Sequence, residues 1–223
     1  MSNEDLDLFL KRTRPIAEPK KDDFKRKYEH DGQSKIGGML INNYFENIAR
    51  LIDEIDLPII SAHEIGCGPG YSTQRLSHLM AETTYFSASE FVEAQLPMAR
   101  KLNPELRIFS ENVYDLKFKD NEFDLVFLLE VLEHLDEPIM ALKEIKRVIR
   151  PGGHFILGVP REPLWRILNM ARGKYLKDFG NTPGHINHWS TRRISKIASD
   201  NIGLLVSVRS PLPWTQVLVR INK

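Results

Sequence analysis

Hydrophobic positions along the chain change their period near residue 58. From Met39 to Ile55, apolar side chains recur at steps of three and four, which predicts an amphipathic helix that Pro58 ends. Beyond Pro58, short runs of consecutive apolar residues alternate with stretches of helical period. Strands that are buried on both faces have such runs, and in parallel sheets they alternate with helices. The pattern therefore predicts an α/β fold.

The expected elements follow one another closely from residue 59 to residue 221. The expected strands cover residues 59–65, 84–89, 106–109, 123–129, 154–159, 204–209 and 217–221. The expected helices cover residues 72–80, 94–102, 139–148, 164–172 and 191–200. Residues 210–213 leave no room for a helix between the last two strands, so we expect those strands to pair antiparallel.

Composition narrows the class of protein. A chain of 223 residues suffices for one domain with a full core. Its single cysteine cannot form an internal disulfide, which favours a reducing compartment. The chain contains no run of roughly 18 to 20 apolar residues, and its acidic first residues are not typical of a signal peptide. We therefore expect a soluble, cytoplasmic protein.

Charge is divided unevenly along the chain. Residues 151–223 carry a net charge of +8, whereas residues 1–150 carry −7. A basic C-terminal third suits an anionic partner, and a merely solvated basic face is the alternative. Residues 1–35 are charged and weakly periodic, so we expect a loosely ordered lead-in there, followed by one domain over residues 36–223.

The richest motif is a glycine loop directly after the first expected strand. Gly66, Gly68 and Gly70 lie where the strand must turn into a helix, so the backbone can approach a ligand closely. The spacing is G-x-G-x-G, whereas dinucleotide sites use G-x-G-x-x-G, and no Gly-Lys-Ser/Thr of a nucleoside-triphosphate loop follows. The loop predicts a cofactor site of another kind, with simple turn chemistry as the alternative.

Polar residues also end the next three strands. Glu90 follows the second strand, where a carboxylate can accept both hydroxyl protons of a ribose. Asn112 and Val113 follow the third strand, where an amide and a backbone N–H can bind the edge of an adenine. Glu130 ends the fourth strand. Together these ends offer contacts for a nucleoside at one edge of the sheet.

These residues resemble the motifs of class I S-adenosylmethionine-dependent methyltransferases, the group that includes quinone-biosynthesis enzymes. The similar segments are Glu64 to Gly70, Asn112 to Leu116 with Phe123-Asp124, Glu130 to Leu135, and Arg150 to Gly153. They cover about half of the chain, between residues 59 and 160. Asn112 departs from the family, in which Asp is common at that position.

The resemblance implies a Rossmann-like, doubly wound, mostly parallel sheet of seven strands with an antiparallel C-terminal edge strand. It implies S-adenosylmethionine as cofactor, with Glu64 at the methionine ammonium and Glu90 at the ribose. Methyl transfer from a sulfonium requires no metal, so we expect none. The residues expected to bind the cofactor are Glu64, Gly66, Cys67, Gly68, Gly70, Glu90, Asn112, Val113 and Glu130. The implied reaction moves a methyl group to an O, N or C atom of a small, hydrophobic or anionic acceptor.

Two histidines are candidate catalytic residues. His134 lies just after the fourth strand, where it can orient the acceptor or take its proton, or can simply shape the loop. His185 belongs to a Gly-His-x-x-His-Trp-Ser element similar to one that faces the substrate in many family members. The pair His185 and His188 is too small a ligand set to indicate a metal site.

Residues 161–187 form an expected lid-like insert. Its apolar helix stripe and the basic residues around it leave three readings open: a lid over a hydrophobic acceptor, a helix that contacts an anionic membrane through residues 163–177, and a helix packed on the sheet. We also expect Phe179, Trp189 and Trp214 to line the acceptor pocket.

Two other functions compete with methyl transfer. One is a noncatalytic module that kept the cofactor fold and docks on a membrane or another anionic partner through its basic C-terminal third. The other is a nicotinamide oxidoreductase, which the glycine spacing disfavours. Nucleic acid is not an expected substrate, because the chain lacks the Asn/Asp-Pro-Pro-Tyr/Phe signature at the end of the fourth strand and has no interleaved aromatic and basic platform.

Overall fold

A computed structural model describes residues 35–222 of the chain. Within that range, seven strands form one sheet in the order β3-β2-β1-β4-β5-β7-β6. They are β1 (Ser61–Ile65), β2 (Tyr85–Glu90), β3 (Arg107–Ser110), β4 (Phe123–Leu129), β5 (Ile149–Pro160), β6 (Gly203–Arg209) and β7 (Trp214–Ile221). Strands β1 to β5 pair in parallel, and β7 is antiparallel to both β5 and β6. The predicted fold class is confirmed.

The helices lie between the strands, as the pattern predicts. They are α3 (Lys35–Ile52), α4 (Tyr71–Ser77), α5 (Leu96–Leu102), α6 (Pro138–Val148), α7 (Leu164–Ala171) and α8 (Thr191–Asn201). Short 3-10 turns are η2 (Glu93–Gln95), η3 (Leu132–His134) and η4 (Leu176–Asp178). Helix α8 begins at the expected cap, because the Ser190 hydroxyl accepts a hydrogen bond from the Arg193 N–H.

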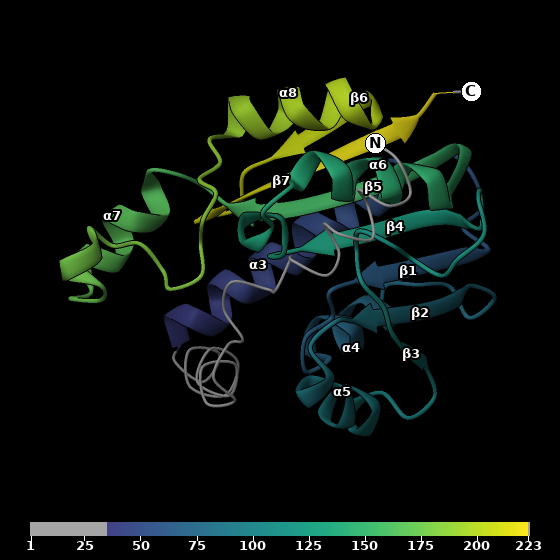
Figure 1. Ribbon diagram of the computed structural model, residues 1–223, viewed down its shortest axis with the longest axis horizontal. Helices are drawn as coiled ribbons and strands as arrows, with labels where there is room; N and C mark the ends of the chain where they lie inside the picture. The colour runs from purple at the N-terminus through teal and green to yellow at the C-terminus, as the bar shows by residue number, and fades with distance from the viewer. Residues whose placement is uncertain (1–34, 223) are drawn as a thin grey trace, which may run out of the picture.

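Helices cover both faces of the sheet (Figure 1). Apolar side chains of α6 and α8 pack on one face, among them Leu142, Ile145 and Ile194. Side chains of α3 and α4 pack on the other face, among them Ile48 and Leu76. All seven residues of β4 are buried, which explains why that strand has no polar alternation except Asp124.

The two last strands differ in burial because of their order in the sheet. Strand β7 lies between β5 and β6, and all of its residues except Arg220 are buried. Strand β6 lies at the edge, where buried or half-buried residues alternate with exposed ones. A strand with one solvated face shows this alternation, so the edge position explains the weaker apolar run of β6.

The insert between β5 and α8 projects away from the sheet as a separate lobe (Figure 1). We call residues 164–180 the insert lobe. Its first turn packs on the core through Trp165, whereas residues 171–179 are all exposed. Buried Asn169 holds the lobe together, since its side-chain amide donates to the Gly180 carbonyl at 2.9 Å. The reading of this helix as packed on the sheet is therefore wrong beyond its first turn.

The expectation of a loosely ordered lead-in at residues 1–35 lies outside the described residues, except for Lys35, which begins α3. Among residues 35–222, every helix is too short or too polar to span a bilayer.

Candidate active site

The parallel strands bring the predicted site residues to one edge of the sheet. The glycine loop follows β1, Glu90 ends β2, Asn112 follows β3 and Glu130 follows β4. Because β1, β2, β3 and β4 are parallel neighbours, all four carboxyl ends lie at the same edge. Ligands of open α/β sheets bind at such an edge, beside the strand where the order reverses, which here is β1.

Two glycines of the loop have backbones that a larger residue would disturb. Gly66 has φ +74°, and a Cβ there would lie 2.5 Å from Val131 Cγ2. Gly70 has φ +89°, and a Cβ there would lie 2.5 Å from Asn103 Nδ2 and 2.9 Å from Ala99 Cα. Backbone N–H groups of Gly66 and Cys67 donate to the Ser89 carbonyl, so the loop is tied to the end of β2. The loop keeps the open backbone that a closely bound ligand needs.

Cys67 is a structural member of this loop. Its side chain is buried, and burial raises the pKa of the thiol, which therefore stays protonated. The Sγ atom lies 3.6 Å from the Gly68 carbonyl oxygen. A buried protonated thiol is a poor nucleophile, so Cys67 contributes packing to the loop.

Glu64 is a buried acid at the base of the loop. Burial raises its pKa to about 7, and the Ser72 and Thr73 hydroxyls oppose that rise. The Thr73 hydroxyl donates to Glu64 Oε2 at 2.5 Å. Within residues 35–222 the other oxygen, Oε1, is buried and accepts no hydrogen bond. A carboxylate in this state fits a cationic ligand group such as an ammonium.

Glu90 points toward the loop, as the ribose assignment requires. Its Oε2 accepts from the Gly68 N–H at 2.8 Å, and its Oε1 accepts from the Val92 N–H at 2.7 Å. Burial raises the pKa of Glu90, while these backbone donors favour its charged form. Each carboxylate oxygen can accept a further hydrogen bond, so the group can still bind two hydroxyls. Glu64, Glu90 and the open loop backbone together fit S-adenosylmethionine.

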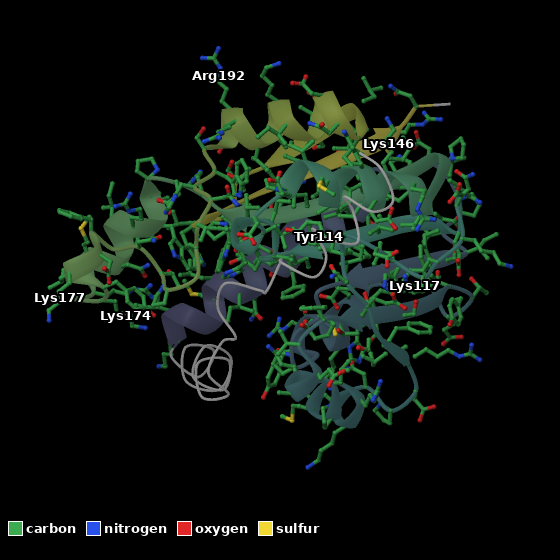
Figure 2. All side chains as sticks on the ribbon, in the orientation of Figure 1. Tyr114, Lys117, Lys146, Lys174, Lys177 and Arg192 are labelled. Carbon is green, nitrogen blue, oxygen red and sulfur yellow. The ribbon has the colours of Figure 1, made fainter. Side chains whose placement is uncertain are left out.

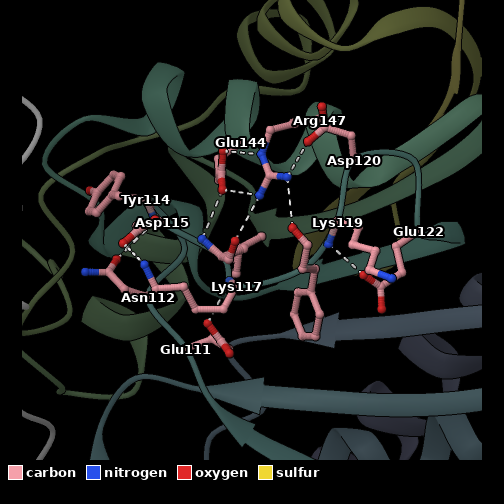
Figure 3. Close-up of polar contacts among 12 residues, drawn as sticks. Glu111, Asn112, Tyr114, Asp115, Lys117, Lys119, Asp120, Glu122, Glu144 and Arg147 are labelled. Carbon is pink, nitrogen blue, oxygen red and sulfur yellow. Dashed lines mark hydrogen bonds and ion pairs between the residues drawn. The ribbon is translucent and has the colours of Figure 1, made fainter. Parts of the chain in front are cut away.

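Asn112 lies in a turn that a polar network holds in place (Figure 3). Its Oδ1 accepts from the Tyr114 N–H at 3.0 Å, and Val113 is buried next to it. Further along the same segment, the Arg147 guanidinium donates to the carbonyls of Leu116 and Phe118. The side-chain oxygen of Asn112 is thus used within its own loop, whereas its NH2 group can donate a hydrogen bond to a ligand.

Glu130 occupies an unusual backbone position at the end of β4. Its φ is +59°, its N–H donates to the Gly158 carbonyl, and its Oε2 accepts from the Trp214 indole at 3.0 Å. Non-glycine residues with such φ values are uncommon and cluster at functional sites. The position turns the Glu130 side chain toward β7.

The two candidate histidines meet across the loops that follow β4 and precede α8. The His134 and His185 rings lie edge to face with centroids 4.9 Å apart. His134 Nδ1 donates to the Gly184 carbonyl at 2.9 Å. Glu133 completes the group, since one ligand atom each of Glu133, His134 and His185 lies within 4.8 Å of the others. His188 is held elsewhere, by Asn181 Oδ1 at 2.9 Å.

Aromatic rings surround this histidine pair. Trp165 stacks on His185 with centroids 6.2 Å apart and lies 5.8 Å from Trp214, which in turn meets Tyr44 edge to face at 5.0 Å. The expected position of Trp214 in the wall of the acceptor pocket fits this arrangement. The expectation for Phe179 is wrong, because its side chain is 72% exposed on the insert lobe. Trp189 instead packs in the core that α6 and α8 share.

Sequence reasoning missed several residues that position the site. Thr73 was visible only as a hydroxyl on the first turn after the glycine loop. Asn103, whose amide donates to the Gly70 carbonyl at 2.9 Å, lies at the far end of α5 and carries no sequence signal of that contact. Trp165 and Tyr44 come from the insert and from α3, where the chain has only helical periodicity.

Comparison with known proteins agrees with this geometry. Residues 63–157 match the sequence profile of a methyltransferase domain. The chain is 27% identical over 162 residues to the mitochondrial ubiquinone biosynthesis O-methyltransferase of Dictyostelium discoideum, which covers 66% of this chain and 49% of that protein. It is 26% identical over 121 residues to the demethylmenaquinone methyltransferase of Staphylococcus aureus, which covers 53% of this chain and 50% of that protein.

A solved structure shows the same fold over nearly the whole chain. It is a S-adenosylmethionine-dependent methyltransferase from Aquifex aeolicus, which superposes with a TM-score of 0.66 at 16% identity and covers 94% of this chain and 100% of that one. The chain spans about half the length of the curated relatives that it matches. The cofactor of this domain is S-adenosylmethionine. The sequence match shows that residues 63–157 are a methyltransferase domain, and the strand order and the acidic ends of β1 and β2 are similar to those of class I S-adenosylmethionine-dependent methyltransferases.

Proposed function

We propose that the protein transfers a methyl group from S-adenosylmethionine to a small acceptor. The observation that carries the proposal is the arrangement of Glu64, Gly68 and Glu90. A buried carboxylate of raised pKa lies below a glycine loop, and a second carboxylate bonds that loop at 2.8 Å. This arrangement offers one group for an ammonium, one for a ribose and an open backbone between them.

Each residue of the cofactor side has a binding role in this proposal. Glu64 binds the methionine ammonium, Glu90 binds the ribose hydroxyls, and Asn112 with Val113 binds the adenine edge. The backbone approaches the cofactor closely at Gly66, Cys67, Gly68 and Gly70. Glu130 contacts the cofactor from the end of β4. When bound, the cofactor would supply a methyl group that is already activated on its sulfonium. The protein's residues would then mainly align the acceptor with that methyl group and exclude water.

The acceptor side is proposed to lie at His134 and His185. Both lie after the ends of strands that flank the cofactor edge, and Trp165, Trp214 and Tyr44 lie around them. Aromatic walls with a few polar groups suit a flat, hydrophobic acceptor. Two of the relatives are named as quinone-pathway methyltransferases, which is consistent with such an acceptor.

Binding and labelled transfer test the reaction. Calorimetry with S-adenosylmethionine and S-adenosylhomocysteine is expected to show binding to the wild-type chain and none to Gly68→Arg. Methyl-labelled cofactor incubated with cell extract, split into lipid and aqueous fractions, is expected to label one product only with the active chain. Cofactor binding without transfer to any fraction would favour the noncatalytic alternative, and absence of binding at millimolar cofactor would end the proposal.

The insert lobe supports a second part of the proposal: residues 161–187 are a lid-like insert that contacts an anionic membrane surface through residues 163–177. Large apolar side chains that stand exposed on the lobe are Ile167, Met170, Tyr175, Leu176 and Phe179. The basic residues beside them are Arg166, Arg172, Lys174 and Lys177, and Asp178 is the one acid of the lobe. Lys174 and Lys177 lie at the far end of the lobe (Figure 2).

Apolar residues interspersed with basic ones are typical of interfacial helices that lie on anionic bilayers. The base of the lobe reaches the site, because Trp165 stacks on His185. A lobe on the membrane would therefore bring the site close to acceptors dissolved in lipid.

Vesicle co-sedimentation tests the contact. The chain is expected to pellet with vesicles that contain phosphatidylglycerol, less with phosphatidylcholine alone, and less at higher salt. Leu176→Ser with Phe179→Ser is expected to reduce the bound fraction severalfold. Leu204→Ser, an exposed apolar residue on β6, is the matched control. Equal pelleting of the double variant and the wild type would overturn the contact.

A further inference from the structure

We infer that Glu133, His134 and His185 bind a divalent transition-metal cation of the zinc class beside the acceptor. The inference rests on the proposed function and deepens it, because it assigns a chemical role to the acceptor-side residues. Among residues 35–222, this is the one group of three metal-ligating side chains whose ligand atoms all lie within 4.8 Å of one another.

The donor set has the composition of a catalytic metal site. Two imidazole nitrogens and one carboxylate oxygen suit zinc, cobalt or iron(II), and three protein ligands leave positions open for a substrate. Calcium and magnesium prefer oxygen ligands, so they are poorer candidates. Glu133 and His185 are both buried, with exposed fractions of 1% and 6%.

Outer contacts orient the ligands as they do in known metal sites. His134 Nδ1 donates its proton to the Gly184 carbonyl, so the neutral ring carries its lone pair on Nε2. Metal-ligating histidines characteristically donate their other N–H to a carbonyl or a carboxylate in this way. The hydrogen bond thus selects the tautomer of His134 that can ligate.

The two ligand loops are fixed to each other through their backbones. The Glu133 carbonyl accepts from the N–H groups of Ile186 and Asn187, each at 3.0 Å. The Asn187 side chain donates to the Leu135 carbonyl at 2.6 Å, and the Asn181 side chain donates to the His185 carbonyl at 3.1 Å. These bonds hold residues 133–135 and 185–187 together across some fifty positions of sequence. The ligands therefore need only side-chain adjustment to close on an ion.

A cation at this position narrows the acceptor class. Its open coordination positions suit an acceptor that presents an oxygen donor, and a Lewis acid beside a hydroxyl favours loss of its proton. The inference therefore favours methyl transfer to an acidic hydroxyl, such as that of a phenol, over transfer to carbon.

Cobalt(II) titration tests the site directly. The chain, stripped with a chelator, is expected to take up one equivalent of cobalt with visible absorption of a site with nitrogen ligands, and zinc is expected to displace it. His185→Gln and Glu133→Gln are each expected to weaken cobalt binding at least tenfold. His188→Gln, three residues away and bonded to Asn181, is the matched control and is expected to bind as the wild type does.

The cobalt titrations can also disprove the metal site. Absence of cobalt absorption at millimolar metal, or binding that the His185→Gln and Glu133→Gln variants leave unchanged, would overturn the inference. Thermal unfolding of each variant without metal shows whether it is folded, and Glu133→Asp keeps a ligating carboxylate if Glu133→Gln does not fold. S-adenosylhomocysteine binding, measured on the same samples, tests the proposed function separately, because its contacts do not include the metal ligands.

Discussion

Thr73 donates its hydroxyl proton to Glu64 at 2.5 Å, from the first turn of α4 to the end of β1. This bond favours the charged form of a carboxylate whose pKa burial raises to about 7. Burial and the Thr73 hydrogen bond together therefore place Glu64 near the midpoint of its titration at neutral pH. A cationic group that reaches Glu64 can complete its ionisation.

Cofactor affinity should depend on pH through Glu64. An ammonium pairs with the ionised carboxylate, so below a pKa of about 7 binding must first remove a proton. Calorimetry should show affinity that rises up to about tenfold per pH unit between pH 5.5 and 7 and then levels off. Glu64→Gln should bind weakly with little pH dependence, and Thr73→Val should move the profile to higher pH. An unchanged slope in Glu64→Gln would exclude Glu64 as the titrating group.

Glu64 should make the stability of the cofactor-free chain fall with rising pH, whereas it makes cofactor affinity rise. Because the pKa of Glu64 is raised in the folded chain, ionisation opposes folding, and stability falls as pH rises from about 4.5 through 7. Glu64→Gln removes this charge and should unfold at a higher temperature than the wild type at pH 8 without cofactor. Excess S-adenosylhomocysteine should raise the wild-type unfolding temperature more than that of the variant. A variant less stable than the wild type at pH 8 would contradict this account.

Gly66 and Val131 should form a testable steric pair. A Cβ at residue 66 would approach Val131 Cγ2 to 2.5 Å, and φ is +74° there. Gly66→Ala should therefore lose about 1 to 3 kcal/mol of unfolding free energy and most of its cofactor affinity. Val131→Ala added to Gly66→Ala should restore the steric part but not the backbone strain. Denaturant unfolding measures both, and no recovery in the double variant would show that the contact with Val131 is not responsible.

The fold and the cofactor side could be predicted from sequence because their signals are local. Apolar runs such as β4 report burial directly, and the glycines, Glu64, Glu90 and Asn112 each follow a strand whose neighbours are set by parallel pairing. A parallel sheet converts strand ends in sequence into one edge in space. Those residues could therefore be assigned to the site from the sequence without knowledge of side-chain contacts.

The acceptor side could not be predicted in the same way because its contacts join distant loops. His134 and His185 lie some fifty positions apart in the sequence, which holds no sign that their ring centroids lie 4.9 Å apart or that Glu133 joins them. The insert posed a different difficulty. A packed helix and a projecting helix can both have the apolar stripe of Leu164, Trp165 and Leu168. The helix projects because the side chain of buried Asn169 bonds to Gly180 within the lobe itself, a contact that the stripe does not indicate.

Arg147 should anchor the segment that carries Asn112. Its guanidinium contacts Glu144 and Asp120 at 2.6 Å each and donates to the carbonyls of Leu116 and Phe118 at 2.9 Å each (Figure 3). Arg147→Met keeps much of the aliphatic stem but removes all of these donors, so the variant should lose about 1 to 3 kcal/mol of unfolding free energy. Lys117→Met, an exposed residue of the same network, should change it by less than about 0.5 kcal/mol. Equal losses in the two variants would show that the carbonyl contacts contribute nothing.

His63 should limit stability in acid. Its ring lies buried between the hydroxyls of Ser87 and Ser89, at 2.8 and 2.9 Å, and burial lowers its pKa to about 3. Between pH 6.5 and 3 the unfolded chain therefore binds a proton at His63 that the folded chain does not, so stability falls as pH decreases through this window. His63→Gln cannot titrate. The difference in unfolding free energy between wild type and variant should shrink by up to about 1.4 kcal/mol per pH unit below pH 6.5. Denaturant unfolding at pH 5, 6 and 7 measures that difference, and a value that stays constant would mean that the imidazole is protonated in the folded chain as well.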